Sequence, residues 1–141
     1  MSCILRIKGE KVDIDTLLSQ VSISPTKIWR KGEKRFITIK ESERFRYSGA
    51  NFVVSDANFD EFEQQKIDTC TFLQKHHQDL TVIVSHDEVE RADLDFGIYR
   101  RDVPVQCDYF EPELLLLCGS LGIGIALSQY PNEDNDECYE E

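Results

Sequence analysis

The sequence predicts an α+β domain in which about three helices pack on one face of a single, mostly antiparallel sheet, in the order β-α-β-β-α-β-β-α-β. Alternating apolar and polar residues recur in several short segments, which is the pattern of strands with one buried face. Three other segments place apolar residues three and four positions apart, as amphipathic helices do. At 141 residues, 40% of them hydrophobic, the chain suffices for one domain with its own core. This architecture leaves the second sheet face to solvent or a partner.

The predicted strands are read from period-two alternation and from the turn residues between them. In the first strand, Cys3, Leu5 and Ile7 share one face, and Gly9 ends the segment. The second and third strands are expected to form a hairpin that contains Gly49. The six predicted strands are Ser2–Lys8, Lys34–Ile39, Asn51–Val54, Leu80–Ser85, Ala92–Tyr99 and Ile123–Leu127.

The three predicted helices are marked by capping residues and by proline. The first spans residues 14–21 after an Asp13 N-cap, and Ser24-Pro25 prevents its continuation. The longest is Phe59–Lys75, and the last begins at Pro112 and ends at Gly122. We expect residues 1–131 to form a single domain. Residues 132–141, with six acids and no base, are predicted to be a disordered tail.

The charge of the chain is divided unevenly along its length. The net charge is −11, yet Lys27–Arg46 holds eight basic and three acidic residues, so this basic island is +5 and the rest −16. Phe36 and Phe45 lie within the island and Tyr47 directly follows it, and basic residues interleaved with aromatic ones resemble a nucleic-acid surface. Because a background of −16 repels a polyanion, we expect no nucleic-acid partner.

The start of the island supplies three candidate binding residues, Trp29, Arg30 and Lys31. Trp29, the only tryptophan, is interpreted either as a plug that covers the edge of the sheet or as a binding anchor. Arg30 and Lys31 are interpreted as solvated cations, as cations paired with acids of the same chain, or as partner contacts. The sequence alone leaves these alternatives open.

The acidic run Asp87–Asp95 is the second candidate surface, with five acids and one base in nine positions. It is expected to connect two strands and to be either a solvated loop or an anionic surface that steers a basic partner. The partner-contact residues predicted here are Asp87, Glu88, Glu90, Asp93 and Asp95.

No segment carries a motif of catalysis, cofactor binding or metal binding, so we expect a protein that is not an enzyme and has no cofactor. The five cysteines contain no Cys-x-x-Cys pair, and His76, His77 and His86 lack chelating spacing. Cys70 and Cys118 fall in helical patterns and are expected to be small buried residues. Apolar residues near the N-terminus are interrupted by charges, and no window is long enough to span a bilayer. We therefore expect a cytoplasmic protein with no membrane partner.

The loop Pro25-Thr26-Lys27-Ile28-Trp29-Arg30-Lys31-Gly32-Glu33, together with Phe110–Leu114 and Leu121–Ile123, resembles a widespread bacterial family of small domains of unknown function. Many members look like the neutralising proteins found beside secreted or contact-dependent toxins. Where a second tryptophan would be expected between Arg44 and Asn51, this chain has aromatic residues of other types. The resemblance implies an immunity protein that neutralises a toxin. We expect it to act by occlusion, and the acidic run predicts that the toxin has a basic surface.

Two alternatives stay open beside the immunity protein. One is a regulatory or structural interaction module of the host, including a homodimer formed through a free sheet edge. The other is a small enzyme.

Overall fold

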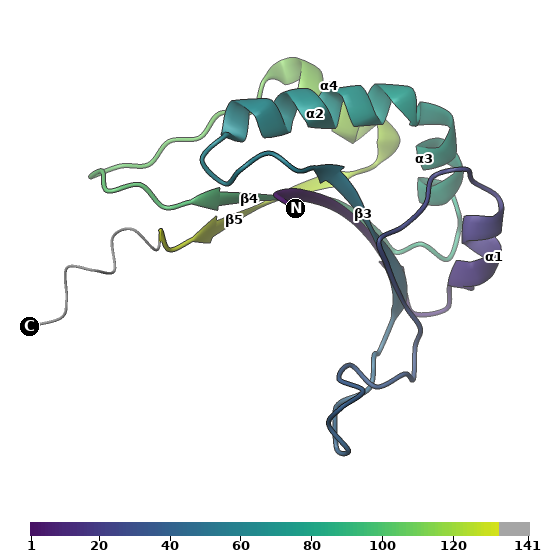
Figure 1. The fold of residues 1–141 in the computed structure, drawn as a ribbon. Helices are drawn as coiled ribbons and strands as arrows, with labels where there is room; N and C mark the ends of the chain where they lie inside the picture. Colours follow the sequence, from purple (N-terminus) through teal and green to yellow (C-terminus); the bar gives the residue numbers. More distant parts are fainter. Residues whose placement is uncertain (133–141) are drawn as a thin grey trace, which may run out of the picture.

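The computed structural model describes residues 1–132 of the chain, so the predicted tail lies outside the described residues except for Asn132. The described residues form one sheet of five strands and four helices (Figure 1). In chain order the elements are β1 (Cys3–Gly9), α1 (Ile14–Ser19), β2 (Lys27–Trp29), β3 (Ser48–Ser55), α2 (Phe62–Lys75), α3 (His77–Val84), β4 (Arg91–Tyr99), α4 (Pro112–Leu121) and β5 (Gly124–Tyr130).

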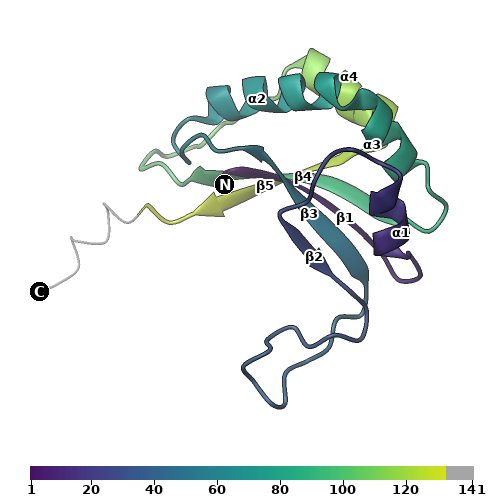
Figure 2. The same ribbon diagram turned by 45° about the vertical axis from the view of Figure 1, so that its right-hand side comes forward.

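The strands are ordered β2-β3-β1-β4-β5. All neighbouring pairs are antiparallel except β4 and β5, which are parallel and joined through α4. The predicted α+β class with one mostly antiparallel sheet is therefore confirmed. Figure 1 and Figure 2 show the helices gathered on one side of this sheet. We call the opposite side the open face.

The core lies between the sheet and the helices. On β1, the alternation of Cys3, Leu5 and Ile7 puts these fully buried side chains beneath the helices. Phe52 of β3 and Phe96 of β4 are the largest side chains buried with them. The last helix begins and ends as expected, because Pro112 occupies its first turn and its C-cap Gly122 adopts a left-handed φ of 80°.

The predicted strand Leu80–Ser85 is wrong, because residues 80–84 belong to helix α3 and Ser85 is its C-cap. Leu80 and Ile83, three positions apart, are fully buried, whereas Val82, which would share a strand face with Leu80, is 40% exposed. The segment therefore follows the helical period, although its β-branched residues favour strands. Four helices, in the order β-α-β-β-α-α-β-α-β, replace the three expected.

The predicted strand Lys34–Ile39 is also wrong. The strand that precedes β3 in the chain and pairs with its outer edge is the three-residue β2. Residues 30–47 between β2 and β3 leave the sheet as a long hairpin that we call the arm. Within the arm a single isolated bridge joins Lys34 to Arg44. The arm extends from one end of the sheet, away from the helices (Figure 2).

In residues 1–132, no helix has both the length and the apolar composition needed to cross a bilayer.

Candidate interaction surface

The open face presents the strand residues that alternate with the core. On β1 these are Ile4, Arg6 and Lys8, all of them half-buried. Cross-strand pairing places Arg6 opposite Asn51 of β3 on one side and Asp93 of β4 on the other. The face is therefore charged at its centre, with cations on β1 and carboxylates on β4.

The other end of the open face is aromatic. Tyr99 and Tyr130 are cross-strand partners at the ends of β4 and β5, and the Phe59 ring lies 5.2 Å from the Tyr130 ring and 5.3 Å from the Tyr99 ring. A Cβ on Gly97 would approach both Phe59 and Tyr130 to 3.3 Å, so the absent side chain lets these rings cover the strand.

Backbone hydrogen bonds hold the arm in one shape. The amides of Gly32 and Arg35 donate to the carbonyls of Phe45 and Glu43, both at 2.9 Å. The tip is closed by two turns, because Ile39 N donates to Phe36 O at 3.1 Å and Ser42 N to Ile39 O at 3.2 Å. These bonds make the arm an ordered hairpin despite its lack of regular strands.

The tip of this hairpin carries three large apolar side chains that the molecule does not cover. Phe36 is 57%, Ile37 89% and Ile39 52% exposed. The basic residues Lys34, Arg35 and Lys40 flank them. An apolar group on an ordered projection, with cations around it, is a feature of docking surfaces.

A cavity of about 420 Å³ lies between the base of the arm and the open face. Strand β1 and the arm supply its cations, while Trp29 of β2 and two rings of the arm supply apolar wall. The lining residues are Arg6, Lys8, Trp29, Arg35, Glu43, Arg44, Phe45, Arg46 and Tyr47. Five cations thus face the cavity with one carboxylate, in a chain whose net charge is −11.

The cations of the cavity differ in how they are held. Arg35 pairs with Glu43 at 3.8 Å and lies over the Phe45 ring, and the Arg44 guanidinium donates to the Gly32 carbonyl at 2.7 Å. The Lys8 ammonium lies 5.1 Å from the centre of the Tyr47 ring. Arg6 and Arg46 form no ion pair or side-chain hydrogen bond with any residue of 1–132. Two guanidiniums of the cavity therefore have no counter-charge within the described part of the chain.

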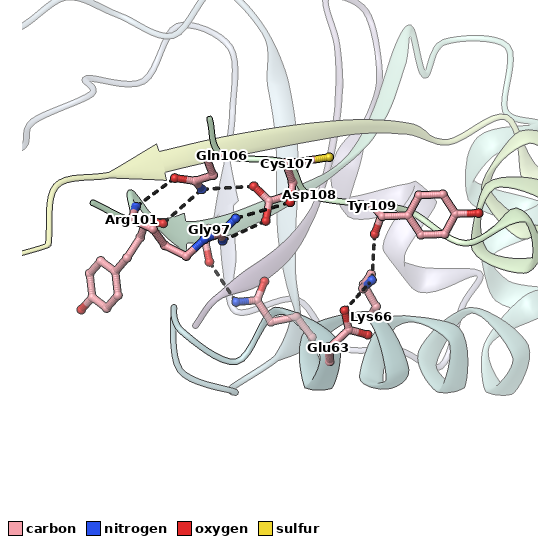
Figure 3. Close-up of polar contacts among 10 residues, drawn as sticks. Glu63, Lys66, Gly97, Arg101, Gln106, Cys107, Asp108 and Tyr109 are labelled. Atoms are coloured by element: carbon pink, nitrogen blue, oxygen red, sulfur yellow. Dashed lines mark hydrogen bonds and ion pairs between the residues drawn. The ribbon is translucent and has the colours of Figure 1, made fainter. Parts of the chain in front are cut away.

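The polar cluster of Figure 3 shows how the chain holds cations that serve its own structure. Lys66 of α2 points toward Glu63 and Tyr109 (Figure 3); its ammonium lies 3.0 Å from a Glu63 oxygen and donates to the Tyr109 carbonyl at 2.7 Å. The same ammonium lies 2.8 Å from a Glu111 oxygen. Arg101 similarly lies 3.0 Å from the buried carboxylate of Asp108. Lys66 thus connects α2 to the loop before α4, and Arg101 connects two parts of that loop. Each of these cations forms an ion pair with a carboxylate of the same chain.

Arg30 and Lys31 follow the same structural pattern. The Arg30 guanidinium binds both carboxylate oxygens of Asp15 at 2.8 Å, and this hydrogen bonding lowers the pKa of the Asp15 carboxyl. Lys31 lies 3.2 Å from a Glu10 oxygen. Of the interpretations of these residues, the structure shows the pairing with acids of the same chain.

Trp29 lies outside the helix-side core. It pairs with Gly49 across β2 and β3, and its ring occupies the place of the missing Gly49 side chain. The ring centre lies 6.1 Å from that of Phe45, so the two rings form one wall of the cavity. Trp29 therefore covers the sheet beside its edge strand and is also half-exposed to the cavity.

The acidic run is not a connection between strands, because it joins α3 to β4 and continues into β4. Three of its five candidates are engaged within the molecule. Glu90 accepts a hydrogen bond from Glu10 N at 2.7 Å, Asp93 pairs with Arg91, and Asp95 accepts from the Ser128 hydroxyl at 2.6 Å. Asp87 and Glu88 are exposed, and their carboxylates bind no other residue among the described ones.

The remaining chemistry-bearing residues are dispersed. No three histidine, cysteine or acidic side chains among residues 1–132 are placed to hold a metal ion. Cys118 is buried, as expected, and Cys70 is half-buried. Burial raises the pKa of the Cys118 thiol to about 11 and that of Cys3 to about 12. These thiols are therefore packing groups.

Sequence reasoning missed Arg6 and Lys8 as members of a site. The signal was present, because alternation with Cys3, Leu5 and Ile7 already puts both cations on the uncovered side of the first strand. The hydrophobic pattern did not predict that the arm would line a cavity together with that strand.

The chain matches no protein-family model, no curated protein and no solved structure. The resemblance to the family with the proline–tryptophan–glycine loop therefore stays a prediction.

Proposed function

We propose that this protein is a non-enzymatic binding protein that docks onto a protein partner through the arm and the open face. The observation that carries the proposal is the exposure of Phe36, Ile37 and Ile39 at the tip of an ordered, projecting hairpin. Large apolar side chains on a preorganised element become buried at low entropic cost, which is how anchor residues of interfaces act.

The charges around the tip of the arm indicate what kind of surface the partner should have. Because basic residues flank the tip, the surface that receives it should be an apolar pocket with acidic groups at its rim. The exposed Asp87 and Glu88 add a separate anionic loop that would attract a basic region of the same partner. The resemblance implies that the partner is a bacterial toxin, and occlusion of its active surface is the mechanism that we propose.

The test compares two variants, each of which replaces three exposed apolar side chains by serine. Phe36, Ile37 and Ile39 are replaced by serine in one, and the exposed helix residues Ile67, Leu115 and Leu116 in the other. Both are tagged, returned to the native host and used for affinity purification with quantitative mass spectrometry. We expect a protein that the wild type and the helix variant retain and the arm variant loses. The purified partner should then bind the arm variant at least about tenfold more weakly in calorimetry.

Two outcomes would overturn the proposal. One is a set of bound proteins that is the same for all three chains, with folding verified by circular dichroism. The other is binding to vesicles of anionic lipid that only the arm variant loses, because a cationic, apolar tip would then be a membrane contact.

A further inference from the structure

The cavity under the arm supports an inference that is independent of docking by the tip. We propose that this cavity binds a nucleoside phosphate, with the phosphate held by Arg6 and Arg46 and the base against the wall formed by Trp29 and Phe45. The proposal assigns a small anionic ligand to a surface that the docking proposal treats only as part of the open face.

The first argument is the unbalanced charge of the cavity. Its lining has five cations and one carboxylate, and that carboxylate, Glu43, already pairs with Arg35. Arg6 is half-buried on β1, and Asp93, its cross-strand neighbour, is paired with Arg91 instead. A partly desolvated guanidinium without a counter-charge is unfavourable by itself, so the site is suited to receive an anion.

The second argument is the chemistry of the cations. Four of the five are arginines, whose planar forks bind two oxygens of a phosphate at once. A phosphate that carries two or more charges neutralises this lining better than a single carboxylate does. Lys8 and Arg35 are already held over the Tyr47 and Phe45 rings, so their positive charges stay at the cavity in the absence of ligand.

The third argument is the aromatic wall. The rings of Trp29 and Phe45 lie 6.1 Å apart with 31° between their planes, so they present neighbouring apolar surfaces to the cavity. A planar base can stack on such a wall, as bases stack on the aromatic side chains of proteins that bind single strands. A cavity of about 420 Å³ falls within the range of about 300–1,000 Å³ of small-ligand sites.

The charge of the remaining chain selects a small ligand over a nucleic acid. Outside Lys27–Arg46 the net charge is −16, which repels a long polyanion that must pass over the rest of the surface. A mononucleotide places its few charges only in the cavity.

Trp29 makes the proposal directly measurable, because the only tryptophan of the chain lines the cavity. Tryptophan fluorescence, checked by calorimetry, is followed during titration with ATP, AMP, adenosine and tripolyphosphate. We expect saturable quenching by ATP and AMP, with weaker binding of adenosine, which lacks the phosphate, and of tripolyphosphate, which lacks the base. The double variant Arg6→Ala, Arg46→Ala should lose at least about tenfold in affinity.

The matched control is Lys11→Ala, Lys75→Ala, which removes the same number of exposed or half-exposed charges outside the cavity and should bind as the wild type does. The proposal is overturned if none of the probes binds below about 10 mM, or if both double variants bind alike. It is also overturned if tripolyphosphate binds as tightly as ATP, because the site would then recognise charge alone. The serine variant of the arm tip should retain ATP binding, so this result is separable from the docking proposal.

Discussion

Gly49 is the residue that lets the aromatic wall lie against the sheet. A Cβ at this position would collide with the Ile7 carbonyl oxygen and with the Trp29 ring. The collision with the backbone of β1 cannot be relieved by a side-chain rotation, so β3 and β1 would have to separate locally. The close approach of Trp29 to β3 thus depends on the absence of a single methyl group.

We expect Gly49→Ala to lower the free energy of unfolding by about 1–3 kcal/mol, as overpacking does. The control is Gly119→Ala in α4, where an added Cβ meets no atom within 4 Å and alanine raises helix propensity by about 1 kcal/mol. Urea unfolding measures both variants. Equal free energies of unfolding for the two variants would contradict the prediction, because the sheet would then accommodate a Cβ at Gly49 without loss of stability.

At the scale of elements, the strands were predictable wherever one face is buried and the other is not. The alternation around Leu5 in β1 and Leu94 in β4 was read correctly, because those strands cross the centre of the sheet under the helices. Helix α3 was predicted as a strand. Leu80, Val82 and Val84 alternate in the sequence, as in a strand, but the buried side chains are Leu80 and Ile83, which follow the helical spacing. Short apolar segments of β-branched residues fit both periods, and tertiary packing decides between them.

The candidate site was predictable only in its charge. The basic island was visible in the sequence, but Arg30 and Lys31 proved to be paired while Arg6, far away in the sequence, joins the cavity. That grouping depends on how the arm folds back, which turns such as that of Phe36–Ile39 determine without a periodic signal. Local patterns therefore indicated the surface but not the site.

Lys66 joins α2 to the beginning of α4 and makes the stability of that junction depend on pH. Its hydrogen bond to Glu111 lowers the pKa of that carboxyl below its ordinary value of 4.5. A carboxyl whose pKa is lower in the folded chain stabilises the fold above its unfolded pKa, and this contribution is lost as the pH falls through the folded value.

We therefore expect Glu111→Gln to be less stable than the wild type near pH 7, with a difference that shrinks as the pH falls below about 4.5. Glu113→Gln is the control, because Glu113 has no ion pair among the described residues. Thermal unfolding between about pH 3 and 7 measures both. A difference that stayed constant with pH would mean that Glu111 contributes packing rather than charge.

On the scale of the whole molecule, some charged side chains contact other parts of the chain and others face only solvent. Glu90, Asp93 and Asp95 contact other parts of the chain, whereas Asp87 and Glu88 extend into solvent after α3. Only the second group can act on a distant partner without losing a contact of its own. If the acidic run steers a basic partner, we therefore expect its first two acids, Asp87 and Glu88, to do so.

Association kinetics with the partner protein found by affinity purification would distinguish the free acids of the run from the engaged ones. If its docking surface is basic near this loop, Asp87→Asn, Glu88→Gln should slow association several-fold at low salt and leave dissociation nearly unchanged. The effect should vanish near 1 M salt, where the Debye length is about 3 Å. Asp93→Asn, Asp95→Asn removes the same formal charge but also the contacts with Arg91 and Ser128, so it should lower stability as well. An unchanged association rate of the first variant, measured at low salt by stopped flow, would leave the arm as the site of recognition and remove the acidic loop from the mechanism.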